Sequence, residues 1–186
     1  MNVYDFDGTI YKKDSSVELY KFVIKRRPYI LFICLPQQLW AILKYKLKLI
    51  TKEQMKEVYF SFLNYLKEES VIDQFVERNM KYINKWYYEK HEDDDVIISA
   101  SPKFLIEKFA KKLNIENVLA TEVEMKTGKF LSKNCHGEEK VRRFKLEFPN
   151  ERIDNFYSDS KTDVYMAKLS KKSYMVKKRK LIKWEI

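Results

Sequence analysis

The chain has 186 residues, and its 37 Lys and Arg residues against 27 Asp and Glu give it a formal charge of +10. Apolar residues make up 45% of the sequence, which excludes a disordered chain, and the length allows one core plus a small inserted module. The positive charge favours anionic partners, namely nucleic acid, acidic lipid or phosphorylated small molecules, although lysine-rich helix faces on a soluble protein explain it more simply.

The chain begins with a short apolar run that ends in two carboxylates and a glycine: Asp5, Asp7 and Gly8. Side chains alternate along a strand, so Asp5 and Asp7 are expected to project together from its carboxyl end. In an open α/β sheet that edge binds ligands, and two close carboxylates repel unless a cation or a proton lies between them. Taken alone, the same residues fit a solvated turn equally well.

Helical patterns fill residues 11–91. Ser15 and Glu18 form a capping box that predicts a helix ending before Pro28, and Thr51 and Gln54 form a second one. The apolar stripes that follow have helical spacing and predict core faces rather than a cofactor site. Their members are Met55, Val58, Tyr59, Phe62, Leu63 and Leu66, then Ile72, Phe75, Val76, Met80, Ile83 and Tyr87.

Residues 28–43 carry no charge, and basic residues flank them on both sides. Crossing a bilayer takes about 20 predominantly apolar residues. This run is shorter and is interrupted at Pro36, so we expect no membrane-spanning helix. One interpretation places it at an anionic membrane surface, with Tyr29, Phe32 and Trp40 as anchors. The other, slightly favoured by the sequence, is a buried helix pair packed against the two stripes.

After residue 91, short apolar runs alternate with helical patterns. Ser101 as N-cap and Pro102 at the first helical position predict one helix start, and residues 123–131 predict a hairpin. A strand, a helical insert and then alternating strands and helices predict an α/β fold with a parallel sheet. The later strands are expected at residues 96–98, 118–120, 153–157 and 174–176.

Polar residues follow four of these strands or their crossovers. They are Asp5 and Asp7, then Ser99, then Lys140, and finally Asp159 with Asp163. Each has an ordinary explanation on its own, as a capping hydroxyl, a solvated lysine or a turn residue. Their joint order is informative, because each falls where an open sheet presents ligand groups.

The string from Asp5 to Ile10, with the later motifs in order, resembles the haloacid dehalogenase-like hydrolases. Residues 99–102 and 135–141 resemble a bacterial subgroup of the phosphoserine-phosphatase-like branch. The resemblance implies a Rossmann-like core of residues 1–10 and 92–186, with an inserted all-helical cap of residues 11–91. The charge-flanked segment of the cap is similar to that of the phosphatidylglycerophosphatases of this branch. Ser158 and Ser160 depart from the pattern, since many relatives have glycine on both sides of the acid.

The resemblance implies a Mg²⁺-dependent phosphomonoester hydrolase. Asp5 is the expected nucleophile, which forms an aspartyl-phosphate, and Asp7 is the expected general acid and base. The acid at position 7 favours a phosphatase over dehalogenase or ATPase chemistry. The expected metal ligands are the Asp5 carboxylate, the Asp7 backbone carbonyl and the Asp159 carboxylate.

The remaining site residues are assigned by the same resemblance. Gly8, Ser99 and Lys140 are expected to bind the phosphate. Asp163 is expected to orient Lys140 or a water on the metal. We interpret His136 as structural, because the implied mechanism does not need it.

The substrate is left open between a lipid phosphate such as phosphatidylglycerophosphate and a small soluble phosphate. Asp14 stands where phosphoserine phosphatases have a substrate-reading acid, but no arginine among Arg26, Arg27 and Arg78 matches their cap arginine, which disfavours phosphoserine. The alternative function is a catalytically weak phosphate-binding or membrane-surface module. No nucleic acid partner is expected. Two cysteines without metal-ligand spacing and no secretory signal predict a cytoplasmic protein, with peripheral contact at the inner membrane face as one interpretation.

Overall fold

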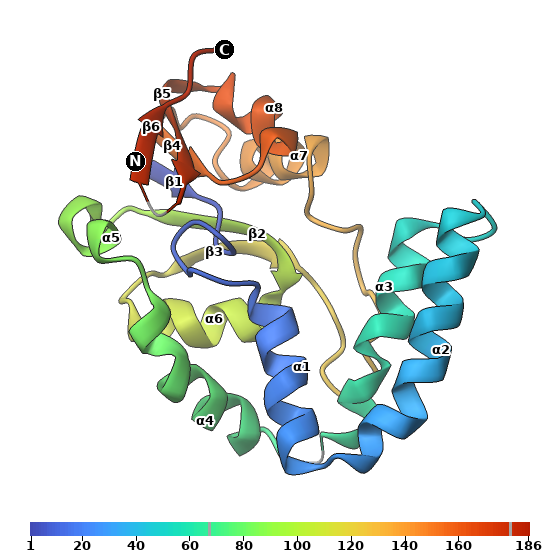
Figure 1. Ribbon diagram of the computed structural model, residues 1–186. Helices are drawn as coiled ribbons and strands as arrows, with labels where there is room; N and C mark the ends of the chain where they lie inside the picture. The colour runs from blue at the N-terminus through green and yellow to red at the C-terminus, as the bar shows by residue number, and fades with distance from the viewer. Residues whose placement is uncertain (67, 179) are drawn as a thin grey trace.

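The computed structural model describes residues 1–66, 68–178 and 180–186. A six-stranded sheet in the order β3-β2-β1-β4-β5-β6 forms its centre, with parallel pairing everywhere except at the edge strand β6 (Figure 1). The predicted parallel α/β fold is therefore confirmed. The strands are β1 Asn2–Tyr4, β2 Val96–Pro102, β3 Asn117–Thr121, β4 Ile153–Ser158, β5 Ser170–Lys177 and β6 Lys180–Lys183.

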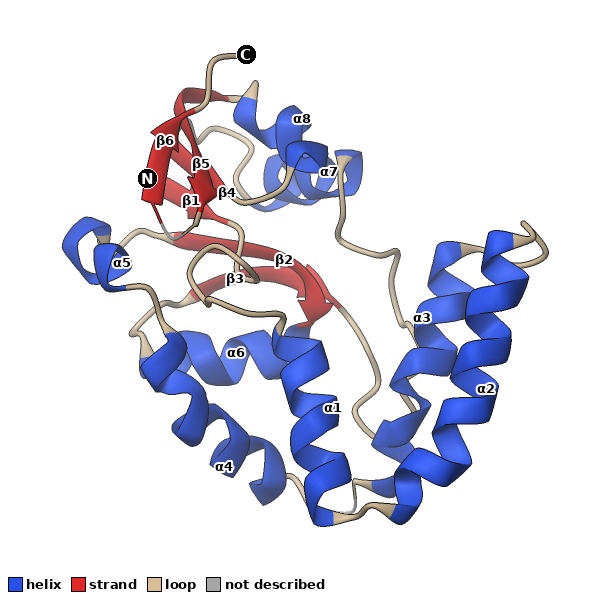
Figure 2. Cartoon of the chain, in the orientation of Figure 1, coloured by secondary structure: helices blue, strands red, loops and turns tan. Residues whose placement is uncertain are grey.

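Both faces of the sheet are covered by helices, as Figure 2 shows. Alternate residues of one strand therefore enter two different cores: Val3 packs with Ile98 and Phe156 on one face, and Tyr4 packs on the other. On that second face the rings of Tyr4 and Tyr157 stack at 4.6 Å. This double burial explains why the strands read as continuous apolar runs.

The helices after β2 complete the two layers. They are α6 Lys103–Lys112, α7 Glu138–Glu147 and α8 Val164–Ala167. Helix α6 lies on one face of the sheet, whereas α7 and α8 lie on the other (Figure 1). Strand β6 was not predicted, because its charged sequence lacks an apolar run and its place at the sheet edge requires none.

The direction in which successive strands are added to the sheet reverses at β1. Val3 of β1 pairs with Val96 of β2 on one side and with Phe156 of β4 on the other. The connections from β1 to β2 and β3 run one way across the sheet, and β4 and β5 lie on the opposite side. A crevice forms at the carboxyl end of the strands at such a switch point, so the topology places the candidate site after β1.

In the described residues between β1 and β2, all the named elements are helical. They are α1 Ser15–Arg26, α2 Tyr29–Lys46, α3 Lys52–Phe60, α4 Ser70–Asn79 and α5 Lys85–Lys90, with 3₁₀ turns at Ser61–Tyr65 and Met80–Tyr82. Helices α2 and α3 form a hairpin beside α1 (Figures 1 and 2). The assignment of residues 11–91 to a separate cap domain stays a prediction. Among the described residues, no helix has the length and hydropathy needed to cross a membrane.

Two predicted helix caps are wrong. Helix α1 is capped by Asp14, whose Oδ1 accepts the Val17 N–H at 2.9 Å, and not by Ser15. Strand β2 extends through Pro102, and α6 then begins without a side-chain cap, so Ser101 does not cap it either. The Ser15 backbone N–H and the Ser101 hydroxyl instead donate to the carboxylate of Asp7. A local pattern cannot anticipate this, because the competing acceptor is remote in sequence.

The expected interruption at Pro36 is also wrong. Helix α2 continues through Pro36 from Tyr29 to Lys46. A proline removes one backbone donor and leaves one carbonyl without its helical partner. Pro36 is exposed, so water can satisfy that carbonyl.

Candidate active site

A cavity of about 580 Å³ opens at the carboxyl ends of β1, β2 and β4. Residues of α1 and α3 complete its wall from the helical insert. Every residue predicted for the site lines this one cavity: Asp5, Asp7, Gly8, Ser99, Lys140, Asp159 and Asp163. The structure thus brings together side chains from four separate stretches of the sequence.

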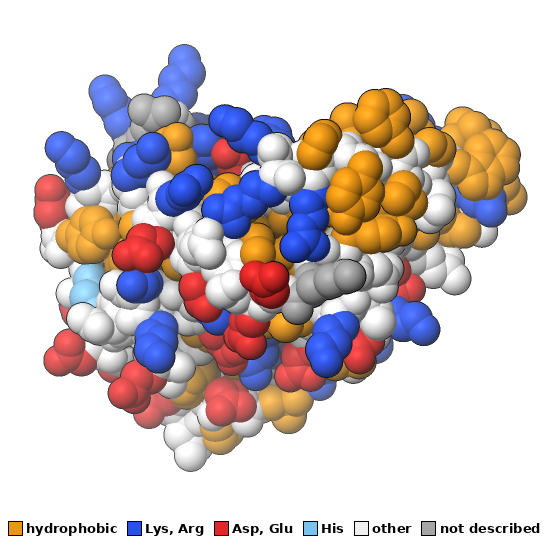
Figure 3. All heavy atoms as spheres, turned by 90° about the horizontal axis from the view of Figure 1, so that it is seen from below, with side chains coloured by type: hydrophobic (Ala, Val, Ile, Leu, Met, Phe, Trp, Pro, Cys, Tyr) orange, Lys and Arg blue, Asp and Glu red, His pale blue; other side chains and the backbone are white. Residues whose placement is uncertain are grey.

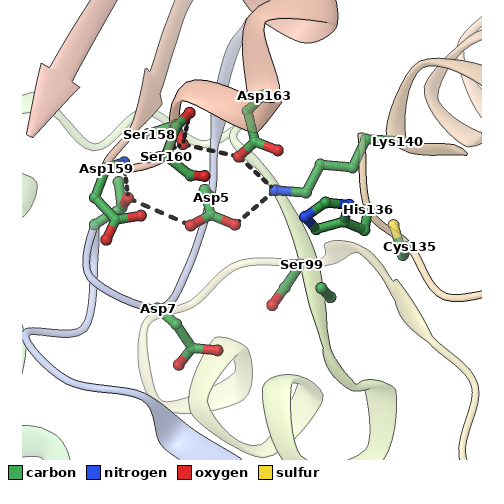
Figure 4. Close-up of polar contacts among 12 residues, drawn as sticks. Asp5, Asp7, Ser99, Cys135, His136, Lys140, Ser158, Asp159, Ser160 and Asp163 are labelled. Carbon is green, nitrogen blue, oxygen red and sulfur yellow. Dashed lines mark hydrogen bonds and ion pairs between the residues drawn. The ribbon is translucent and has the colours of Figure 1, made fainter. Parts of the chain in front are cut away.

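Lys140 links two of the carboxylates (Figure 4). Its side chain is only 2% exposed, and Nζ donates to Asp5 Oδ1 at 2.7 Å and to Asp163 Oδ2 at 2.8 Å. Burial lowers the pKa of Lys140, but the two carboxylates outweigh that effect and hold it well above its ordinary value. The Ser158 hydroxyl donates to the same Asp163 oxygen at 2.8 Å. Lys140 is therefore a fixed cation at the floor of the cavity.

Asp5 lies directly after β1, and its backbone N–H still donates to the Tyr157 carbonyl at 2.9 Å. Its Oδ2 accepts the Thr9 hydroxyl at 3.4 Å. Burial raises the pKa of Asp5 to about 7, although Lys140 acts in the opposite direction. The negative charge of this carboxylate is thus incompletely compensated by the protein, and a further cation would stabilise it.

Asp7 has different hydrogen-bond partners from Asp5, and Lys140 pairs with Asp5 alone of the two. Its Oδ1 accepts the Ser15 N–H at 2.6 Å and its Oδ2 accepts the Ser101 hydroxyl at 2.5 Å. Burial raises the pKa of Asp7 to about 6, and nearby Asp14 adds to the shift. A carboxyl group with that pKa can both give and take a proton near neutral pH.

Asp159 approaches the loop after β1 through Gly8. The backbone of Gly8 has φ +73°, and a Cβ at this position would lie 2.0 Å from Asp159 Oδ2. Only glycine allows this conformation and this close approach together. Thr9 holds the backbone of Asp159 in place, because its hydroxyl accepts the Asp159 N–H at 3.0 Å.

The donor set around Asp159 fits Mg²⁺. Among the described residues no cation pairs with the Asp159 carboxylate, and burial raises its pKa. Hard divalent cations prefer carboxylate and carbonyl oxygens, which Asp159, Asp5 and the backbone of Asp7 supply. These are the three ligands that the sequence motifs predicted.

Two of the predicted phosphate contacts have geometries that the sequence did not suggest. The Gly8 N–H already donates to the Lys13 carbonyl at 3.2 Å, so the close approach of Asp159 accounts for the glycine better than phosphate binding does. The Ser99 hydroxyl accepts the Ser101 N–H at 3.1 Å. Within the described residues its own proton has no acceptor, so it is available to a ligand in the cavity.

Sequence reasoning missed Lys56 and Ser101. Lys56 Nζ donates to Asn134 Oδ1 at 3.0 Å, and burial lowers its pKa, with Lys52 contributing. The available signal was its spacing from Tyr59, because residues three apart share a helix face, and both line the cavity. The cap predicted at Ser101 is local, whereas its hydroxyl bonds the Asp7 carboxylate, which is 94 residues away in sequence.

His136, which we interpret from the sequence as structural, contributes to the cavity. It lines the wall, and its Nε2 is 3.2 Å from the Thr162 hydroxyl. Burial and the neighbouring Lys52 lower its pKa, which favours a neutral ring. A neutral ring bound to a hydroxyl agrees with a structural role.

A sequence model described as haloacid dehalogenase-like hydrolase matches residues 3–168. The fold is similar to a protein of unknown function from Bordetella pertussis, with 17% identity, a TM-score of 0.69, and coverage of 90% of this chain and 85% of that one.

Two further solved structures share the fold. A phosphoserine phosphohydrolase-like protein from Francisella tularensis is 17% identical, with a TM-score of 0.56 and coverage of 93% and 86%. A probable phosphoserine phosphatase from Vibrio cholerae is 12% identical, with a TM-score of 0.61 and coverage of 92% of this chain and 55% of that one. No curated protein matches the sequence.

Proposed function

The chain belongs to the haloacid dehalogenase-like hydrolase family, and on this basis we propose that it is a Mg²⁺-dependent phosphatase that hydrolyses phosphomonoesters. The observation that carries the proposal is the convergence of Asp5, Asp7, Lys140 and Asp159 on one cavity. One of the similar structures is described as phosphoserine phosphohydrolase-like and another as a probable phosphoserine phosphatase, which supports the same reaction class.

In the first half of the proposed reaction, an Asp5 carboxylate oxygen attacks phosphorus. A bond forms between that oxygen and phosphorus, and the bond from phosphorus to the ester oxygen breaks. The leaving oxygen takes its proton from Asp7, whose raised pKa of about 6 keeps a protonated fraction available. The products are the free alcohol and an aspartyl-phosphate on Asp5.

In the second half, Asp7 takes a proton from water while the water oxygen attacks phosphorus. The bond between phosphorus and the Asp5 oxygen breaks, which releases inorganic phosphate and restores the carboxylate. Asp7 regains the proton that it gave to the leaving group, so the cycle balances. Ser101 and the Ser15 N–H keep the Asp7 carboxyl in position during both proton transfers.

Charge compensation accompanies both halves. Lys140 would balance the Asp5 carboxylate and the transferring phosphoryl oxygens, and the Ser99 hydroxyl would donate to one of those oxygens. Mg²⁺, when bound by Asp5, Asp159 and the Asp7 carbonyl, would screen the nucleophile from the anionic phosphate. Asp163 holds Lys140 in place at 2.8 Å.

Lys56 points to a substrate with an anionic group beyond the transferred phosphate. Its ammonium contacts neutral oxygens, those of Asn134 at 3.0 Å and of the Ala100 backbone at 3.5 Å. It lines the cavity from the side of the helical insert. A cation with neutral partners at this wall would bind a carboxylate or a second phosphate of the substrate.

The experiment measures phosphate release from a panel of soluble and lipid phosphomonoesters, with Mg²⁺ and with EDTA. We expect turnover that needs Mg²⁺ and that Asp5→Asn abolishes, while Asp93→Asn, a change at an exposed carboxylate, leaves it intact. Activity that survives Asp5→Asn would remove the nucleophile from the proposal.

A second measurement separates catalysis from mere phosphate binding. Beryllofluoride imitates an aspartyl-phosphate, so it should raise the melting temperature of the wild type in the presence of Mg²⁺. It should leave Asp5→Asn unchanged. A wild type that binds inorganic phosphate but shows neither turnover nor this shift would instead be the catalytically weak module that the sequence left as the alternative.

A further inference from the structure

Helix α2 turns most of its large apolar side chains away from the protein. Phe32 is 80% exposed and Trp40 is 57% exposed. The exposed surface continues into the turn before α3, where Leu49 is 68% exposed. We call this set the α2 face; it comprises Tyr29, Phe32, Ile33, Leu35, Leu39, Trp40, Ile42, Leu43, Tyr45, Leu47 and Leu49. Figure 3 shows apolar side chains gathered at the end of the molecule where α2 and α3 lie.

Helix α2 exposes more large apolar side chains than it buries, which is the opposite of what is expected for a helix that only packs on the protein core. Its buried stripe is Ile30, Cys34, Gln38 and Ala41, two apolar residues with a cysteine and an amide. Gln38 is fully engaged there, since it accepts the Tyr20 hydroxyl at 2.8 Å and donates to the Tyr59 carbonyl at 3.0 Å. The bulkier apolar side chains face outward, and a contiguous exposed patch of this kind marks an interaction surface.

Along the chain, the charges that flank the α2 face all have one sign. Residues 19–52 contain no Asp or Glu. Only Lys21 among their cations pairs with a carboxylate in the described parts of the chain. The cations next to the two ends of α2 are Lys25, Arg26, Arg27, Lys44, Lys46, Lys48 and Lys52, and Lys21 lies farther back on α1. An apolar strip between two basic ends is complementary to a surface that is anionic outside and apolar below.

We propose that the α2 face docks on an anionic lipid bilayer surface, with α2 lying in the plane of the membrane. The 18 residues of the helix give it a length of about 27 Å, and its tryptophan and tyrosine rings suit the headgroup region. A second copy of the chain is a poorer occupant, because pairing two such faces would bring two sets of cations together. Nucleic acid would satisfy the charges but not the apolar side chains.

Vesicle co-sedimentation tests the proposal with the full chain. We expect the wild type to pellet at low salt with phosphatidylcholine vesicles that contain phosphatidylglycerol, and not with phosphatidylcholine alone. The triple change Phe32→Ser, Leu39→Ser, Trp40→Ser should weaken binding at least about tenfold, because apolar insertion is lost. Leu146→Ser, a change at a residue 68% exposed on α7, should have no effect.

Charge reversal at Lys44, Lys46 and Lys48 should also release the protein, and added salt should imitate it. Trp40 supplies a direct readout, since its fluorescence should shift to the blue on vesicles. Trp40→Phe should abolish the shift while the protein still pellets.

Three results would overturn the proposal. The wild type could stay in the supernatant, or Leu146→Ser and the triple variant could lose binding equally. The third is a wild type that forms a dimer and binds no vesicles, while the triple variant is monomeric. Unchanged melting temperatures exclude misfolding of the variants. Vesicle binding requires no turnover, so failure here leaves the proposed phosphatase activity untouched.

Discussion

Replacing Lys140 by methionine would test the electrostatic design of the cavity floor. The change keeps an apolar side chain of similar length but removes the ammonium that lies 2.7 Å from Asp5 Oδ1 and 2.8 Å from Asp163 Oδ2. Removing one partner of a buried ion pair leaves an uncompensated charge and costs about 3–5 kcal/mol. A chain of this size loses about 2–4 °C per kcal/mol, so we expect the melting temperature to fall by about 6–20 °C.

The size of this loss should depend on pH, because Asp5 can be neutralised by a proton. Burial raises its folded-state pKa to about 7, above the ordinary value near 4. A carboxyl group with a raised pKa contributes stability below its unfolded-state pKa and loses that contribution as pH rises through its folded-state pKa. Without Lys140 the pKa rises further, so the destabilisation should be largest above about pH 7 and should shrink toward about pH 4.

The assay is thermal unfolding followed by circular dichroism in EDTA across this pH range. Lys145→Met removes an exposed lysine from the same helix and serves as the control, with an expected change within about 0.5 kcal/mol. Adding Asp5→Asn to Lys140→Met should restore part of the stability, since one of the stranded charges disappears. Equal melting temperatures for Lys140→Met and Lys145→Met at about pH 8 would refute the view that Lys140 balances buried charge.

Three further outcomes are expected. Gly8→Ala should abolish Mg²⁺-dependent turnover, because its Cβ would lie 2.0 Å from Asp159 Oδ2 in a backbone with φ +73°; full activity of this variant would contradict the close approach. Ser101→Ala removes a hydrogen bond that lowers the pKa of Asp7, so the pH–rate profile should move to higher pH, and an unmoved profile would contradict the contact. The rise in melting temperature on adding Mg²⁺ should be larger at about pH 8 than at about pH 5 and absent in Asp159→Asn, because burial raises the Asp159 pKa and protons compete for the metal oxygens.

The parallel sheet could be predicted because its strands are short apolar runs between helical patterns. Val96 to Ile98 is an example, since all three residues are buried on the two faces of one sheet. The helix caps at Ser15 and Ser101 could not be predicted. Both serines satisfy the local rule, but Asp14 caps the first helix, and the Ser101 hydroxyl donates to the carboxylate of Asp7, which is remote in sequence.

The sequence predicts which residues gather at the candidate site, but it does not predict the contacts between them. Asp5, Lys140 and Asp159 follow strands that an α/β topology must bring to one edge, so their convergence follows from the fold. Lys56 belongs to the helical insert, and its place depends on how α3 packs. The orientation of α2 was equally hidden, because a helix that is apolar on all sides carries no periodic signal for its buried stripe.

The central place of β1 has a consequence for the order of folding. This strand of three residues pairs with β2 through Val96 and with β4 through Phe156, so both of its neighbours come from distant parts of the chain. Contacts of such large sequence separation form slowly, since loop entropy is lost before they contribute, whereas α1 to α5 are local structures. During synthesis Asp5 and Asp7 emerge first, yet they cannot meet Lys140 and Asp159 until β4 and the loop after it have left the ribosome. Hydrolysis would therefore begin only after synthesis has passed β4 and Asp159.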